Sequence, residues 1–129
     1  VKVNGNNKLS AQGGFLKDGW VETKVGTFGT YAVWIDTIPP TIQALNFKDK
    51  KKITSKQKSL QIKISDNLSG ILSYNAYLNN EWVLMEYDGK NARLTHTIDD
   101  KLKEGENTLK IIVYDKKNNV STQEYTVIR

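Results

Sequence analysis

The 129-residue sequence has no cysteine and a single histidine, His96, and these two shortages remove much of the usual catalytic and metal-binding chemistry. Without cysteine there can be no disulfides, iron–sulfur clusters or thiol nucleophiles. A single histidine excludes most zinc sites, which need several histidine or cysteine ligands. The sequence therefore predicts no catalytic residues, no cofactor and no enzyme activity for this chain.

Long apolar runs and helical periodicity are also missing. No run approaches the roughly 18 apolar residues that a bilayer-spanning helix needs, so the sequence predicts no membrane span. Hydrophobic residues make up 38% of the chain and charged residues 26%, which is compatible with a domain that has a packed core.

Basic charge is concentrated in one segment, residues 48–58, which carries six lysines and one aspartate and accounts for the net charge of +5. This segment has no arginine and no aromatic residue, which are the side chains that bind phosphates bidentately and stack on bases. We interpret it as a solvated loop whose lysines protect the edge of the preceding strand. The sequence therefore predicts no nucleic-acid partner.

Alternation of apolar and polar residues with a period of two is abundant, and short polar turns interrupt it. Leu60, Ile62 and Ile64 alternate with polar residues, and Asn79-Asn80 separates two runs as a two-residue hairpin turn would. The predicted strands are residues 41–47, 59–65, 72–78, 81–88, 92–98, 107–115 and 121–128. Seven short strands without crossover helices indicate an all-β fold, an antiparallel immunoglobulin-like β-sandwich.

The same alternation predicts which side chains enter the core. His96 is in phase with the apolar residues of its strand, so we expect a hydrogen-bonded packing residue rather than a catalytic one. Large side chains should supply much of the bulky core area, and the candidates are Tyr74, Trp82, Met85 and Tyr87.

The first 36 residues differ from the rest because they are polar and rich in glycine. We expect a hairpin here between residues 20–24 and 30–36. Pro39 and Pro40 then fix two φ angles and remove two donors, which predicts a stiff linker. The chain is therefore divided into an N-terminal hairpin segment, residues 1–36, and a sandwich, residues 37–129. The segment either extends the sandwich or is the tail of a preceding β-domain.

Four pieces of sequence carry a resemblance to known modules: DTIPPTI at 36–42, SDNLSGI at 65–71, EWVLMEYD at 81–88 and NTLKIIVYDKKNN at 107–119. They resemble the bacterial immunoglobulin-like modules of surface and periplasmic proteins. The chain from about residue 13 to 129 is more closely similar to the region after the catalytic domain in Bacteroidetes lysostaphin-type zinc metallopeptidases, which are peptidoglycan endopeptidases.

This resemblance implies a non-catalytic accessory or interaction module of an exported cell-wall peptidase, periplasmic or at the cell surface. The module would pack on or position a preceding catalytic domain of the same chain. Enzymes of that type hold zinc through HxxxD and HxH motifs, and a chain whose one histidine is His96 can contain neither. The alternative is a carbohydrate- or surface-binding adhesion module whose partner is peptidoglycan or another glycan.

Two sets of residues are candidates for contacts. An exposed tryptophan can pack on a neighbouring domain or stack on a sugar ring, and the interaction candidates are Trp20, Trp34 and Trp82. Oxygen-bearing side chains gather in loops that meet at one end of an immunoglobulin-like fold, and the calcium candidates are Asp36, Asp66, Asp115 and Asn118. We favour the alternative that each aspartate caps its own turn.

Overall fold

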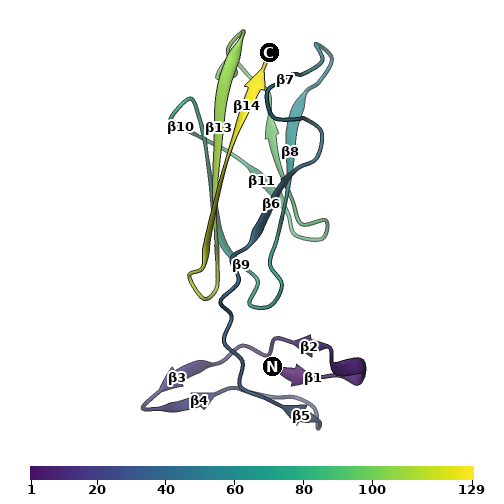
Figure 1. The fold of residues 1–129 in the computed structure, drawn as a ribbon, viewed down its shortest axis with the longest axis vertical. Helices are drawn as coiled ribbons and strands as arrows, with labels where there is room; N and C mark the ends of the chain where they lie inside the picture. The colour runs from purple at the N-terminus through teal and green to yellow at the C-terminus, as the bar shows by residue number, and fades with distance from the viewer.

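Two sheets face each other in the computed structural model, which describes residues 1–129 (Figure 1). The strands of the first sheet are β7 (Lys51–Lys52), β9 (Ile71–Leu78), β10 (Glu81–Val83), β13 (Glu106–Asp115) and β14 (Val120–Ile128). The strands of the second are β6 (Thr41–Ala44), β8 (Ser59–Ser65), β11 (Glu86–Asp88) and β12 (Arg93–Thr97). The sheet orders are β10-β9-β13-β14-β7 and β11-β12-β8-β6. All pairs are antiparallel except β14 with β7, so the predicted immunoglobulin-like β-sandwich is confirmed.

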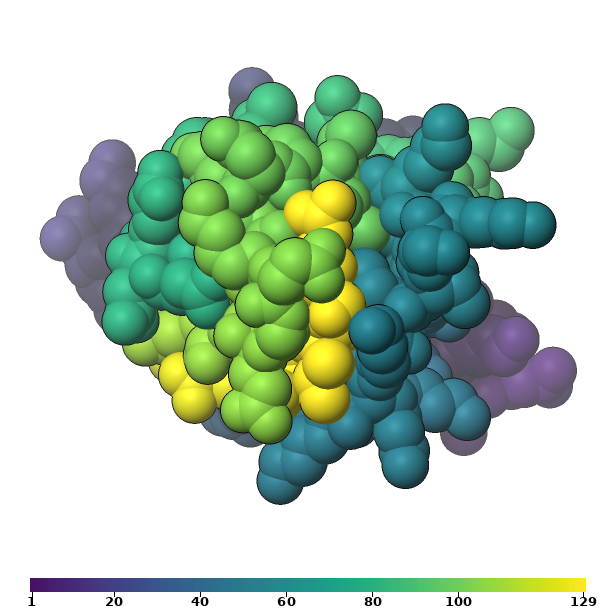
Figure 2. All heavy atoms as spheres, turned by 90° about the horizontal axis from the view of Figure 1, so that it is seen from above, coloured from purple at the N-terminus to yellow at the C-terminus, as the bar shows by residue number.

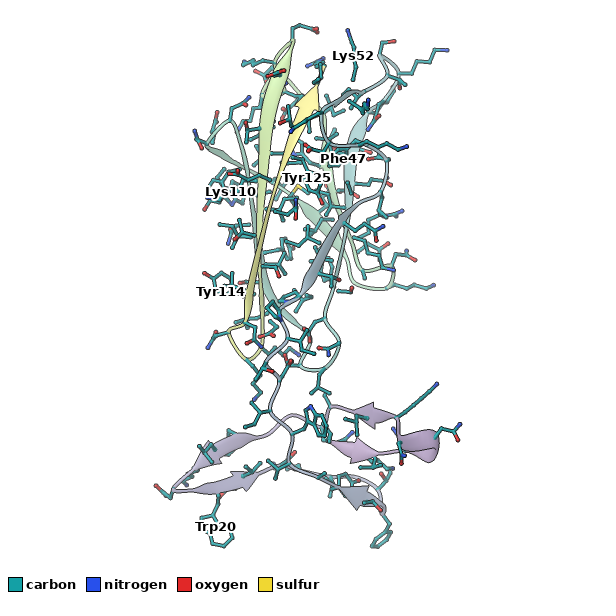
Figure 3. The ribbon with its side chains drawn as sticks, viewed as in Figure 1. Trp20, Phe47, Lys52, Lys110, Tyr114 and Tyr125 are labelled. Carbon is teal, nitrogen blue, oxygen red and sulfur yellow. The ribbon has the colours of Figure 1, made fainter.

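The core between the sheets is aliphatic, because alternate residues of the central strands β8 and β13 point inward and are completely buried. Aromatic residues contribute at its margin, where the rings of Phe47 and Tyr125 meet edge to face at 5.3 Å (Figure 3). The prediction that large side chains supply much of the core area was only partly right. Met85 is buried and Tyr74 is partly buried against the core, where its ring lies 5.4 Å from that of Tyr87. Tyr87 is nevertheless 40% exposed, and Trp82, whose phase is opposite to that of Val83 and Met85, is half exposed.

The predicted strand 81–88 is two strands that belong to different sheets. β10 pairs with β9, whereas β11 pairs with β12, so the chain crosses from one sheet to the other at Leu84-Met85. Val83 and Met85 are both buried on either side of this crossing, which explains why apolar alternation continued through it without a break.

The lysine-rich segment contains a short strand that alternation did not reveal. Strand β7 pairs in parallel with the end of β14, with Lys51 opposite Val127. Ile53 is buried next to it and holds the segment against the core. The six lysines are exposed, and none of them forms an ion pair. The blue part of the chain, which includes this segment, protrudes on one side of the molecule (Figure 2).

The N-terminal segment forms two small sheets that do not pair with the sandwich. Its elements are β1 (Lys2–Val3), η1 (Gly5–Asn7), β2 (Leu9–Ser10), β3 (Phe15–Lys17), β4 (Trp20–Glu22) and β5 (Thr30–Tyr31), and the sheets are β2-β1-β5 and β3-β4. The predicted hairpin between residues 20–24 and 30–36 was wrong. Asp18-Gly19, with φ angles of 49° and 81°, closes a tight two-residue turn from β3 to β4, and β5 pairs instead with β1.

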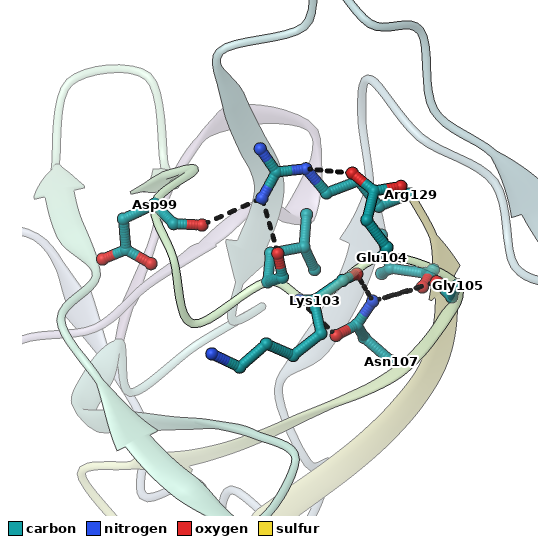
Figure 4. Close-up of polar contacts among 8 residues, drawn as sticks. Asp99, Lys103, Glu104, Gly105, Asn107 and Arg129 are labelled. Carbon is teal, nitrogen blue, oxygen red and sulfur yellow. Dashed lines mark hydrogen bonds and ion pairs between the residues drawn. The ribbon is translucent and has the colours of Figure 1, made fainter.

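The segment lies beyond one end of the sandwich, and the C-terminus lies at the other end (Figure 1). A polar network closes the C-terminal end around the buried Asn107 (Figure 4). Asn107 Oδ1 accepts the Lys103 N–H and an Asn79 side-chain N–H, both at 2.8 Å, while its Nδ2 donates to the Lys103 carbonyl at 2.7 Å. Arg129 donates to the carbonyl of Leu102 at 2.6 Å. No helix in the protein has the length and apolar character to cross a membrane.

Candidate functional site at the seam

Three carboxylates meet where the linker from the N-terminal segment enters the sandwich. Asp36 ends that segment, Asp66 begins the loop between β8 and β9, and Asp115 is the last residue of β13, directly before the loop to β14. One carboxylate oxygen from each lies within 4.8 Å of the other two. Asp115 is completely buried and Asp36 is 8% exposed, so two of the three charges are shielded from solvent.

Asp66 and Asp115 each hold their own loop through backbone N–H groups. Asp66 Oδ2 accepts the N–H groups of Leu68 at 3.1 Å and Gly70 at 2.7 Å. Asp115 Oδ1 accepts the N–H groups of Lys117 at 2.7 Å and Asn119 at 2.9 Å. The turn-capping role that the sequence favoured is therefore present in both loops.

Asp36 does more, because it reaches a loop that is distant in the sequence. Its Oδ2 accepts the Ser69 N–H at 2.9 Å, while Oδ1 accepts the Ile38 N–H at 3.3 Å. Hydrogen bonding from Ser69, first from the side chain and then from the backbone, lowers the pKa of Asp36, and the charge of Lys117 adds to the shift. The Asp36 carboxylate thus ties the linker to the β8–β9 loop in its charged form.

Asn119 ties the linker to the other loop. Its Nδ2 donates to the Asp36 carbonyl at 3.0 Å and to Asp115 Oδ2 at 2.7 Å. The Ser121 hydroxyl then donates to the Pro40 carbonyl. Asn118, a calcium candidate from the sequence, is exposed and has a φ of 64°. It therefore shapes the turn, while Asn119 makes the contact with the linker.

Sequence reasoning missed Ser69, Asn119 and Ser121 as members of this seam. Each lies in or beside a polar loop, and their types suit such turns in general. Their partners are 33, 83 and 81 positions away in the sequence, so no local spacing could have indicated them.

The cluster offers an all-oxygen donor set of the kind that Ca²⁺ uses. Calcium–oxygen distances are about 2.4 Å, so oxygens bound to one ion lie no more than about 4.8 Å apart, and the three carboxylate oxygens meet this condition. Asp66 Oδ1 is buried and has no hydrogen-bond partner. Asp36, Asp66 and Asp115 could therefore hold a calcium ion, and such an ion would bridge the linker and both loops.

The three tryptophans lie in three different surroundings. Trp20 is 76% exposed and points away from the rest of the protein (Figure 3). Trp34 is exposed together with its neighbours Val33 and Ile35, so neither face of that stretch enters a core. Trp82 lies on strand β10 at the edge of the sandwich and is half exposed.

His96 has the position that its phase predicted, buried under the β10–β11 crossing. Its Nδ1 is 2.9 Å from the carbonyl oxygen of Leu84. The interpretation as a hydrogen-bonded packing residue agrees with this contact.

No protein-family model and no curated protein matches the chain. Among solved structures, the chain is similar to one described as "Structures of Clostridium thermocellum CbhA fibronectin(III)-like modules", with a TM-score of 0.53 and 14% sequence identity. The similarity covers 70% of this chain and 46% of that one, so the match spans less than half of that protein's length. At this identity the comparison establishes the fold. The sandwich therefore has an immunoglobulin-like β-sandwich fold that is similar to that of fibronectin(III)-like modules.

Proposed function

We propose that the chain is a non-catalytic accessory module of an exported cell-wall peptidase, and that it positions a preceding catalytic domain of the same chain. The fibronectin(III)-like fold supports a role as an accessory or binding module. The cell-wall context and the peptidase rest on the resemblance of the DTIPPTI, SDNLSGI and EWVLMEYD pieces to the region behind lysostaphin-type domains.

The observation that carries the positioning role is the doubly tied linker. Asp36 bonds to Ser69 in one loop, and Asn119 in the other loop bonds back to Asp36. The linker also contains Pro39 and Pro40, whose φ angles are fixed by their rings. A linker held at both loops transmits the orientation of the sandwich to whatever lies on its other side.

Pulsed EPR distance measurements between two spin labels can test whether the linker is rigid. The chain has no native cysteine that would interfere with labelling. Spin labels attached to the substitutions Lys17→Cys and Lys63→Cys report the distance between the N-terminal segment and the sandwich. We expect a single narrow distance distribution that broadens in Asn119→Ala. The matched substitution Asn118→Gly, at the exposed neighbour, keeps a residue that tolerates the φ of 64° and should leave the distribution unchanged. A distribution that is already broad in the unmodified background would contradict the positioning role.

The peptidase assignment has a separate test. The coding sequence on the N-terminal side of Val1 should encode a domain with HxxxD and HxH motifs. Repeated copies of the DTIPP module there, without those motifs, would favour an adhesin.

The second candidate function is a carbohydrate- or surface-binding module, and the exposed tryptophans favour it. Soluble muropeptides should change the tryptophan fluorescence if this function is present. A purely positioning module would leave the fluorescence unchanged.

A further inference from the structure

Two shallow hollows flank Trp82 on the outer edge of the sandwich. One has a volume of about 230 Å³ and the other about 360 Å³, and both are lined by Trp82, Val83 and Leu84. Strand β10 and the start of its crossing to β11 therefore form a ridge between them. We propose that this edge binds a linear, hydroxyl-rich glycan that lies across Trp82, with sugar units on both sides of the ridge.

The indole of Trp82 presents apolar surface to solvent, and one hydrogen bond orients it. Its one polar group, Nε1–H, donates to Asn75 Oδ1 at 3.2 Å, so the donor is already used within the protein. About half of the residue, 51%, remains exposed. A ring held by a hydrogen bond and open to solvent can stack on the C–H face of a sugar with little loss of side-chain entropy.

The smaller hollow supplies hydrogen-bonding groups beside the ring. Its lining includes two carboxylates, two hydroxyls and an ammonium group, from Glu86, Asp99, Thr95, Thr97 and Lys101. Lys101 is held by Glu81 at 3.0 Å, while Glu86 forms no ion pair and is exposed. Carboxylates accept hydrogen bonds from sugar hydroxyls, and threonine hydroxyls can both donate and accept.

A buried nitrogen in this hollow has no partner. His96 also lines it, and only 4% of that residue is exposed. Because the Leu84 carbonyl can only accept, Nδ1 must carry the proton, and Nε2 of the neutral ring is then an acceptor. Nε2 is buried and unpaired. If binding opens a path from the hollow to this atom, a ligand hydroxyl supplies the missing donor.

The larger hollow is mostly apolar and includes Leu72, Tyr74 and Met85 in its lining. Each sugar unit of a glycan has hydroxyl groups at its rim and an apolar C–H face. The hydroxyl groups suit the polar hollow and the C–H faces suit the apolar hollow and the Trp82 ring. A protein partner suits the edge less well, because charged residues are depleted from the centre of protein interfaces and Glu86 and Lys101 lie beside this tryptophan.

Titration of the ¹⁵N-labelled chain with chitohexaose, cellohexaose and soluble muropeptides, each as a separate probe, tests the proposal. We expect saturable shifts of the Trp82 indole signal and of the Thr95 and Thr97 amides with at least one of these glycans. The ¹⁵N signal of His96 Nε2 should move toward that of a hydrogen-bonded acceptor. Trp82→Ala should weaken binding about tenfold or more, and Trp20→Ala, at a tryptophan that is more exposed and lies outside this edge, should not.

Three results would overturn the proposal. The first is the absence of saturable shifts at millimolar glycan, and the second is equal weakening of glycan binding by Trp82→Ala and Trp20→Ala. The third is that the same signals shift with protein concentration alone, which would mark the edge as a contact between copies of the chain. The proposal rests on the second candidate function, carbohydrate binding, and assigns it to one site. It is independent of the positioning role, because the labels at residues 17 and 63 do not report on this edge.

Discussion

Calcium should stabilise the metal-free protein by bridging Asp36, Asp66 and Asp115. Three buried or half-buried carboxylates repel one another, and no ion pair neutralises them. A site with three protein carboxylates and no EF-hand loop is expected to bind Ca²⁺ weakly, with a dissociation constant of about 10⁻⁴ to 10⁻³ M. At about 10 mM Ca²⁺ the expected stabilisation is then about 1.4 to 2.7 kcal/mol.

Thermal unfolding after treatment with a chelator measures this effect directly. The expected gain corresponds to a rise in Tm of roughly 6 to 20 °C for a domain of this size. Mg²⁺ at the same ionic strength should give a much smaller rise, since it requires a tight octahedral shell that these loops do not provide. The midpoint of the calcium titration gives the dissociation constant.

Asp66→Asn is the most informative variant, because it removes the charge at the carboxylate with an unpaired buried oxygen. The amide oxygen can still accept the N–H groups of Leu68 and Gly70, so the loop should keep its turn. Asp99→Asn, in a turn outside this cluster, is the matched control. The reasoning fails if calcium gives no rise at 10 mM, if Mg²⁺ gives the same rise, or if Asp66→Asn responds as the unmodified protein does.

Three further predictions concern stability and local order. Asn107→Ala should lower the free energy of unfolding by about 3 kcal/mol in urea denaturation, because it removes a buried side chain whose hydrogen bonds join the backbone of Lys103 to Asn79; a loss below about 1 kcal/mol would contradict this. The pKa of Asp36 in the folded protein lies below its ordinary value of 3.8, so its stabilising contribution is present above that pH and is lost as the pH falls through the folded pKa. Asp36→Asn should therefore flatten the fall of stability with acid, and an unchanged pH profile would refute its role. Amide exchange should be fast in residues 1–35 and slow in β13, and equal protection of both would show that the segment is held by the sandwich.

The sandwich could be predicted from sequence because its information is local. Leu60, Ile62 and Ile64 alternate in phase, and polar turns separate the runs, so the strands follow from a period of two. The crossing at Leu84-Met85 could not be found in this way, because both flanking positions are buried and the period does not change when a strand changes sheets.

The seam was only partly predictable, because it depends on contacts between residues distant in the sequence. The loops carrying Asp66 and Asp115 were expected at one end of the fold from topology alone. The sequence could not show which asparagine side chain joins the β13–β14 loop to the linker, because Asn118 and Asn119 are adjacent residues of the same type. They differ in the structure because Asn118 has a positive φ and Asn119 does not. The prediction of which N-terminal strands pair was wrong because two turns compete. The turn at Asp18-Gly19 closes a shorter loop than a turn around Gly26 and Gly29 would.

The tied linker and the unburied N-terminal segment are two parts of one arrangement. In residues 1–35 no side chain is buried, and large apolar side chains such as those of Leu16, Trp20 and Phe28 are exposed. Sheets of two or three short strands are marginal without a partner, and apolar surface of this extent is typical of an interface. A stiff linker has a mechanical effect only when both of its ends are held. The sandwich holds one end through Asp36 and Asn119, and the apolar surface at the other end is what a neighbouring domain would cover, which is the arrangement that the positioning role requires.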